Sequence, residues 1–216
     1  MKKSPPIHEF FAAPLYTYGN ALINWQGQPT QDLTVYAHNY RRAAMCLVSM
    51  YQQRIHGTID EGALPILFLY RHAIELYLKA IVYKAAVVTI NEMELKAALP
   101  KLWREHSLLA LAEMAKPIIS VNSGELLAMN GELDRRILDI ASRIDAVDSG
   151  SYTFRYPVNS RGTGAIPYLF MTNVFVFSRE VEGMLDDMAQ FCRHLESKRI
   201  ESSGQIKLAL HGLHTT

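Results

Sequence analysis

Four polar side chains interrupt an apolar stretch of this sequence, and their types are suited to chemistry. They are Arg71, His72, Glu75 and Lys79, within LPILFLYRHAIELYLKAIV at 64–82. At about 100° per residue of helix, the four positions fall on one stripe. Histidine titrates near neutral pH and suits acid–base steps, whereas guanidinium and ammonium groups stabilise developing phosphate charge.

The stripe has two interpretations. A buried charge costs on the order of several kcal/mol unless it is paired or solvated, so these residues need partners or a cleft. One interpretation is a ladder of ion pairs, Arg71–Glu75–Lys79, of the kind common at i,i+4 spacing. The other is a polar site set in a helical core.

Two further polar residues stand in apolar surroundings. His106 opens HSLLAL in an amphipathic run, and Arg155 lies in FRYP within a long irregular segment. We expect Arg155 to meet Glu75 across a cleft, because an Arg–carboxylate pair in a low-dielectric setting orders a loop. The alternatives are a His106 that hydrogen-bonds a backbone carbonyl and an Arg155 that pairs with Asp145 or Asp148.

These residues together make one candidate site. The candidate catalytic residues are His72, His106 and Arg71. The candidate binding cleft consists of Glu75, Lys79, Arg155, Asp145 and Asp148. His72 and Glu75 are spaced i,i+3, and His106 or Asp145 could complete a metal site, but that spacing is unspecific. We therefore expect no metal and no cofactor.

Other chemical motifs are absent from the sequence. Gly162–Thr163–Gly164 lacks the strand–turn–helix context of a phosphate loop, and there is no GxSxG nucleophile elbow. The two cysteines, Cys46 and Cys192, form no CxxC pair, which excludes a zinc ribbon and a dithiol redox motif. We expect both to be buried thiols in a reducing compartment.

Composition is that of an ordinary globular domain. The chain has 216 residues, of which 49% are hydrophobic and 20% charged, and its net charge is +1. That balance gives no electrostatic case for a nucleic-acid or membrane surface. The prolines in MKKSPPIHEFF interrupt any signal-peptide core, and Arg71 and His72 break the longest apolar run. The sequence therefore predicts a soluble, cytoplasmic protein without a membrane span.

The elements that must position the site are helices. Apolar spacing predicts helices over 32–55, 64–86, 101–115, 122–144 and 168–198, with a short helical piece at 95–99 and Pro117 closing the third. Residues 145–167 form the one long irregular segment, which we expect to be ordered. The sequence thus predicts an all-α, up-and-down bundle of about five helices. The predicted divisions are an N-terminal arm (1–29), a helical domain (30–198) and a C-terminal tail (199–216).

Three motifs occur in an order that is more informative than any one of them. LYRHAIELYLKAIV, then HSLLAL, then DAVDSGSYTFRYP, followed by a long closing helix, resemble the HEPN-like helical proteins of prokaryotes. The resemblance covers residues 63–185. It implies a helical bundle that is frequently a homodimer, and a place in RNA-targeting systems such as toxin–antitoxin pairs or antiviral defence.

The resemblance does not extend to the family's catalytic motif. Nucleolytic HEPN proteins use a metal-independent Arg-x4–6-His motif, with one copy from each protomer meeting at the dimer interface. None of the eight histidines in this chain has an arginine five to seven residues upstream. We therefore expect a binding or assembly component, with a partner protein, RNA or a nucleotide as the molecule bound.

Two alternatives stay open. The first is a metal-independent endoribonuclease with a non-standard site, where His72 or His106 takes the 2′-hydroxyl proton. Arg71, Lys79 or Arg155 would then stabilise the phosphate charge. The second alternative is a nucleotide-binding or small-molecule-binding module that uses the same cleft.

Overall fold

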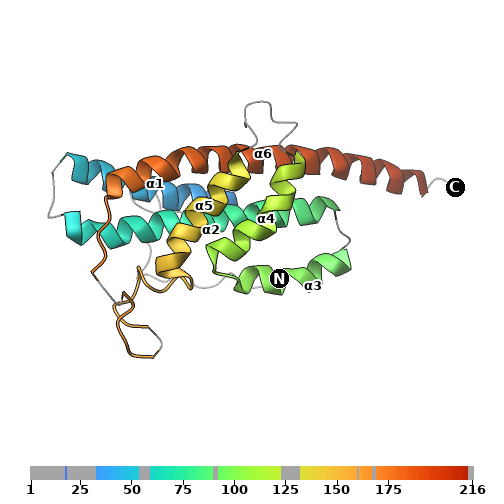
Figure 1. Ribbon diagram of the computed structural model, residues 1–216. Helices are drawn as coiled ribbons and strands as arrows, with labels where there is room; N and C mark the ends of the chain where they lie inside the picture. Colours follow the sequence, from blue (N-terminus) through green and yellow to red (C-terminus); the bar gives the residue numbers. More distant parts are fainter. Residues whose placement is uncertain are drawn as a thin grey trace. The chain divides into compact units, whose positions relative to one another are not determined.

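The described part of the chain is entirely helical apart from its loops. The computed structural model describes residue 18 and residues 33–53, 59–89, 92–122, 132–159, 161–166 and 169–213. The chain divides into two compact units, Met1–Asp32 and Leu33–Thr216. The predicted arm over 1–29 lies outside the described residues apart from Tyr18. In the described part of the second unit the elements are α1 (Leu33–Gln52), α2 (Ile59–Thr89), α3 (Glu92–Arg104), α4 (Leu108–Asn122), α5 (Leu133–Asp148) and α6 (Val174–Leu213) (Figure 1).

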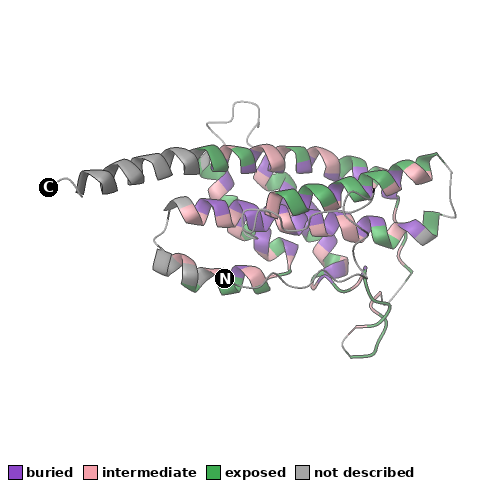
Figure 2. Cartoon of the chain, turned by 180° about the vertical axis from the view of Figure 1, so that it is seen from behind, coloured by how far each residue is buried: buried purple, intermediate pink, exposed green. Residues whose placement is uncertain are grey.

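The predicted all-α class is confirmed, and α2 is the central helix. It packs against α1, α3, α4 and α6, and buried residues gather along it (Figure 2). The helix is apolar nearly all round, so it is stable only with neighbours on several sides. It extends beyond the predicted 64–86 at both ends, so Pro65 lies inside the helix rather than in its first turn. Its fully buried side chains include Ile66, Tyr70, Ile74, Tyr77, Leu78 and Ile81.

The predicted helix over 101–115 is wrong, because the chain breaks between α3 and α4. Ser107 ends the break as the N-cap of α4: its Oγ accepts the N–H of Ala110 at 3.0 Å, and its carbonyl accepts the N–H of Leu111 at 3.1 Å. Pro117 lies inside α4 instead of closing it. It is exposed, and it has no N–H to donate to the carbonyl of Glu113 four residues before it.

The last two helices also differ from their predicted bounds. Helix α5 continues through Asp148, so the irregular segment begins four residues later than predicted. Helix α6 begins at Val174 rather than 168, because the Asn173 side chain accepts the N–H groups of Phe175 and Val176, each at 3.1 Å. It runs on through residues 199–213, where a tail was predicted.

Burial separates the two thiols that were predicted to be alike. Cys192 is buried in α6, where desolvation raises the pKa of its thiol to about 12. Cys46 in α1 is exposed, so the prediction for it is wrong. No helix within the described ranges is long and apolar enough to cross a membrane.

Candidate functional site

Arg71 is the centre of a buried polar network in α2. Its side chain is 0% exposed, and its Nη1 donates to Glu75 Oε2 at 2.7 Å. Its Nη2 donates to the carbonyl of His106 at 2.5 Å, in the segment between α3 and α4. Its Nε lies 3.1 Å from Asp148 Oδ2 at the end of α5, as an ion pair without the alignment of a hydrogen bond. One guanidinium therefore ties three separate parts of the chain together.

Glu75 is the acidic counterpart of Arg71 in this network. Its Oε1 accepts a hydrogen bond from Lys79 Nζ at 2.8 Å and lies 2.9 Å from His106 Nδ1. Burial alone would raise the pKa of this carboxyl group, but Lys79 and Arg71 outweigh burial and hold the pKa below its ordinary value. Lys79 also donates to the carbonyl of Trp103 at 3.3 Å. The predicted ladder Arg71–Glu75–Lys79 is thus confirmed and is saturated by internal partners.

His106 is the member of the network that reaches solvent. Its side chain is 50% exposed, although Nδ1 is in contact with Glu75. An ionised carboxylate accepts only, so the neutral imidazole carries its proton on Nδ1 and leaves Nε2 as the basic nitrogen. The arrangement is a carboxylate-oriented imidazole at the surface.

His72 lies apart from the polar contacts of its helix. Its ring stacks on Phe68 with centroids 5.7 Å apart and meets the edge of Tyr40 at 4.5 Å. Burial lowers the pKa of His72, and the attraction of Glu75 does not restore it. Within the described part of the chain, no three His, Cys, Asp or Glu side chains are grouped so as to hold a metal ion.

Asp145, predicted as part of the binding cleft, caps the N-terminus of α4 from α5. Its Oδ2 accepts from Ser107 Oγ at 2.5 Å and from the N–H of Leu109 at 3.0 Å. Its Oδ1 accepts from the N–H of Leu108 at 3.0 Å. A carboxylate at this end of a helix satisfies N–H groups and complements the helix dipole. Asp145 therefore locks α4 against α5.

Asp148 links the network to the loop that follows α5. Its Oδ1 accepts from the N–H of Tyr152 at 2.7 Å and from that of Thr153 at 3.0 Å, while Oδ2 faces Arg71. Ser151, which lies between Asp148 and Tyr152 in the chain, is buried and has a positive φ of 62°. This conformation costs a non-glycine residue about 1 kcal/mol. The bonds to Asp148 therefore hold the chain in a turn that it would not adopt alone.

The predicted pairing of Arg155 with Glu75 is wrong, and so is the alternative with Asp145 or Asp148. Those carboxylates are occupied by the partners described above. Arg155 instead donates its Nε to the carbonyl of Ser151 at 2.5 Å. Its guanidinium carbon lies 5.4–5.6 Å from the centroids of three rings, those of Phe68, Tyr152 and Tyr156. Phe68 thus lies in contact with both Arg155 and His72.

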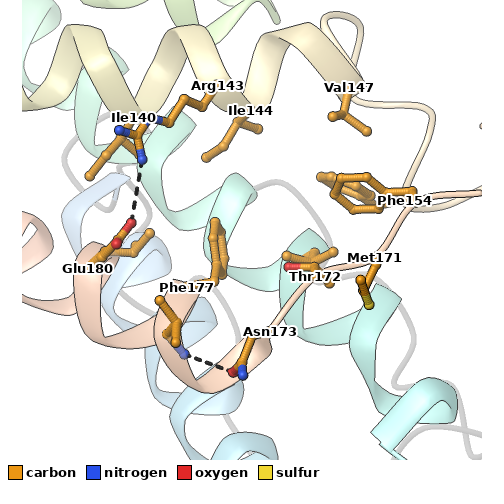
Figure 3. A pocket seen from close by; sticks show the side chains of 14 residues that line it. Ile140, Arg143, Ile144, Val147, Phe154, Met171, Thr172, Asn173, Phe177 and Glu180 are labelled. Carbon is orange, nitrogen blue, oxygen red and sulfur yellow. Dashed lines mark hydrogen bonds and ion pairs between the residues drawn. The ribbon is translucent and has the colours of Figure 1, made fainter.

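A hollow that sequence reasoning missed lies between α5, the start of α6 and residues 169–173 (Figure 3). Its volume is about 380 Å³, and its walls are mostly apolar. Arg143 and Glu180 stand at its edge with 3.8 Å between their charged atoms, and Met171 beside it is 92% exposed. The apolar wall comes from Leu67, Ile140, Ile144, Val147, Phe154, Phe170, Phe177 and Val181.

The structure unites most of the predicted residues but divides their roles. Five of them form one connected network, namely Arg71, Glu75, Lys79, His106 and Asp148. Asp145 belongs to the capping of α4, and His72 and Arg155 both contact the ring of Phe68. No family model, curated protein or solved structure matches the chain.

Proposed function

We propose that this chain is a cytoplasmic, HEPN-like helical protein that acts as a binding or assembly component in RNA-related or antiviral defence machinery. The observation that carries the proposal is that Arg71, Glu75 and Lys79 are buried and bonded to partners inside the protein. The order of the three sequence motifs supports the family, and the missing Arg-x4–6-His motif supports a role without catalysis.

Saturation of the network favours a structural role over catalysis. A group that transfers a proton or stabilises charge must reach the substrate, within hydrogen-bonding distance or through one water. Arg71 is 0% exposed, and the side chains of Glu75 and Lys79 are 3% and 6% exposed. Their bonds run to one another and to the backbone carbonyls of Trp103 and His106. They hold segments of the chain in place.

What the network holds in place is a surface loop. Arg71 fixes Asp148, which bonds the backbone of Tyr152 and Thr153 and so fixes the turn that follows α5. Functional residues are often carried on loops that a rigid scaffold positions. This loop exposes Tyr152 and Tyr156, 57% and 51% respectively, which suits a binding role.

A second candidate function is metal-independent RNA cleavage, and one observation favours it. His106 is half exposed and oriented by Glu75, as a general base requires. Cleavage also needs a cation on the phosphate. Of the three cations considered for that role, Arg71 and Lys79 are enclosed and bonded internally. Arg155 is exposed but lies outside the network that holds His106, so the binding role has the stronger support.

An RNA-cleavage assay on chelator-treated protein tests the choice between the two. Wild type is compared with His106→Ala and with His38→Ala, a matched change at an exposed histidine of α1. We expect no cleavage by any of the three. Cleavage by wild type and His38→Ala that is lost in His106→Ala would overturn the binding role. Light scattering on the same samples is expected to give a homodimer, twice the 24.4 kDa of the chain; a monomer would contradict the assembly role.

A further inference from the structure

The turn of residues 151–156 presents Arg155 at the surface in one orientation. The Nε of Arg155 donates to the carbonyl of Ser151 at 2.5 Å, yet the residue as a whole is exposed. The backbone of the turn is tied through Asp148 to the fully buried Arg71. A side chain held in this way loses little freedom when it binds a partner, and such preorganisation increases affinity.

Three aromatic rings surround the guanidinium. Its central carbon lies 5.6 Å from the ring centroid of Phe68, 5.5 Å from that of Tyr152 and 5.4 Å from that of Tyr156. Stacking of this kind stabilises the cation and leaves the edge of the guanidinium available for hydrogen bonds. Tyrosine and arginine are the residue types that most often dominate binding energy at protein interfaces.

No described residue neutralises the charge of Arg155. Within the described ranges Arg155 has no ion-pair partner. Its one hydrogen bond there uses Nε, so both terminal amino groups are available to a ligand. The expected partner Glu75 and the alternatives Asp145 and Asp148 are all bonded elsewhere. Two terminal N–H groups in one plane match the two oxygens of a carboxylate.

An acidic protein segment fits this surface better than a nucleic acid does. Binding to a nucleic-acid backbone draws on several cations that contact successive phosphates. Here the neighbouring cations Arg71 and Lys79 are enclosed, and the net charge of the chain is only +1. The guanidinium lies over the rings of Tyr152 and Tyr156, so a base would have to compete with it for those ring faces.

We propose that Arg155, flanked by Tyr152 and Tyr156, is a docking site for an acidic segment of a partner protein. The guanidinium binds an Asp, Glu or C-terminal carboxylate of that segment, and the two tyrosine rings pack against its adjacent apolar side chains. The site rests on the proposed binding function and names the chemistry of the partner.

A random-peptide display library, selected on the purified full chain, tests the site. Selection is run on wild type, Arg155→Gln, Arg155→Lys and Arg135→Gln, the last a matched change at an exposed arginine of α5. We expect carboxylate-containing peptides to be enriched on wild type and Arg135→Gln alone. A selected peptide, made with a fluorescent label, should bind at least about tenfold more weakly to Arg155→Gln, and to wild type when its acid is replaced by the amide.

Arg155→Lys keeps the charge but loses the planar fork and the stacking, so it should also bind the peptide weakly. Circular dichroism on each variant checks that the fold is intact. The site is refuted if no acidic peptides are enriched, or if Arg155→Gln enriches and binds them as wild type does. Binding of a labelled oligouridine that is lost in Arg155→Gln, without peptide enrichment, would assign the surface to nucleic acid instead. Either failure leaves the binding role standing, because only the cleavage assay decides between that role and catalysis.

Discussion

Replacing Arg71 by methionine is the sharpest test of the buried network. Methionine is unbranched and fills a similar space, so the change removes charge with little change in packing. It leaves Asp148, which is 1% exposed, without its cation, and it leaves the carbonyl of His106 without its donor. Glu75 keeps Lys79 and His106.

The cost follows from the uncompensated carboxylate. Removing one partner of a buried ion pair typically destabilises a protein by about 3–5 kcal/mol, because the other charge stays buried alone. That is a large part of the ~5–15 kcal/mol by which a typical domain is stable. Adding Asp148→Asn to the Arg71→Met change removes the orphaned charge. We therefore expect the double variant to recover part of the loss, with a coupling of about 0.5–3 kcal/mol.

Urea unfolding followed by circular dichroism gives the free energy of unfolding for each variant by linear extrapolation. Arg135→Met is the matched control, because the pair of Arg135 with Glu132 is exposed, 77% and 64%, and such pairs contribute about 0–1 kcal/mol. If Arg71→Met cost no more than this control, Arg71 would be solvated in solution. The internal saturation that supports the binding role would then be refuted.

Two further predictions concern the cap and the buried histidine. Asp145→Ala removes the cap of α4 and should lower the free energy of unfolding, measured in urea, by about 1–2 kcal/mol. Asp139→Ala, on the exposed side of α5, is the control and should lower it by less. Equal losses for the two variants would contradict the capping role. Burial lowers the pKa of His72 in the folded protein, so His72 takes up a proton at higher pH in the unfolded chain. The free energy of unfolding should therefore fall as the pH decreases through about 6.5. Glu75 titrates at lower pH, because its pKa lies below the ordinary value of a carboxyl group. His72→Phe should remove that fall in pH-dependent thermal melting, and an unchanged profile would show that His72 is not its source.

The contact between α5 and the N-terminus of α4 could not be predicted from the sequence. Serine is favoured at helix N-caps, so Ser107 marked a possible helix start. The apolar spacing on either side of it nevertheless indicated one continuous helix. What stabilises the break is Asp145, 38 residues along the chain from Ser107. Hydrogen bonds between residues so far apart in the chain depend on how the helices pack against one another. The spacing of apolar residues within one helix carries no information about that packing.

What the sequence determined by itself is local. The apolar stripes predicted the all-α class and the burial of α2, because the side chains on one helix face follow from the helical repeat alone. The same repeat predicted the ladder Arg71–Glu75–Lys79, whose members are four residues apart.

Only the tertiary structure decided the role of the loop residues. From the sequence, Asp148 was an alternative partner for Arg155 and Arg71 was assigned to Glu75. The packing of α5 against α4 and α6 places Asp148 beside Arg71 instead. Arg155 was thereby left on the outside, stacked on aromatic rings instead of paired with Glu75. Ion pairs between distant segments are chosen by the geometry of the packed helices, because a buried charge must take the partner that packing brings within reach.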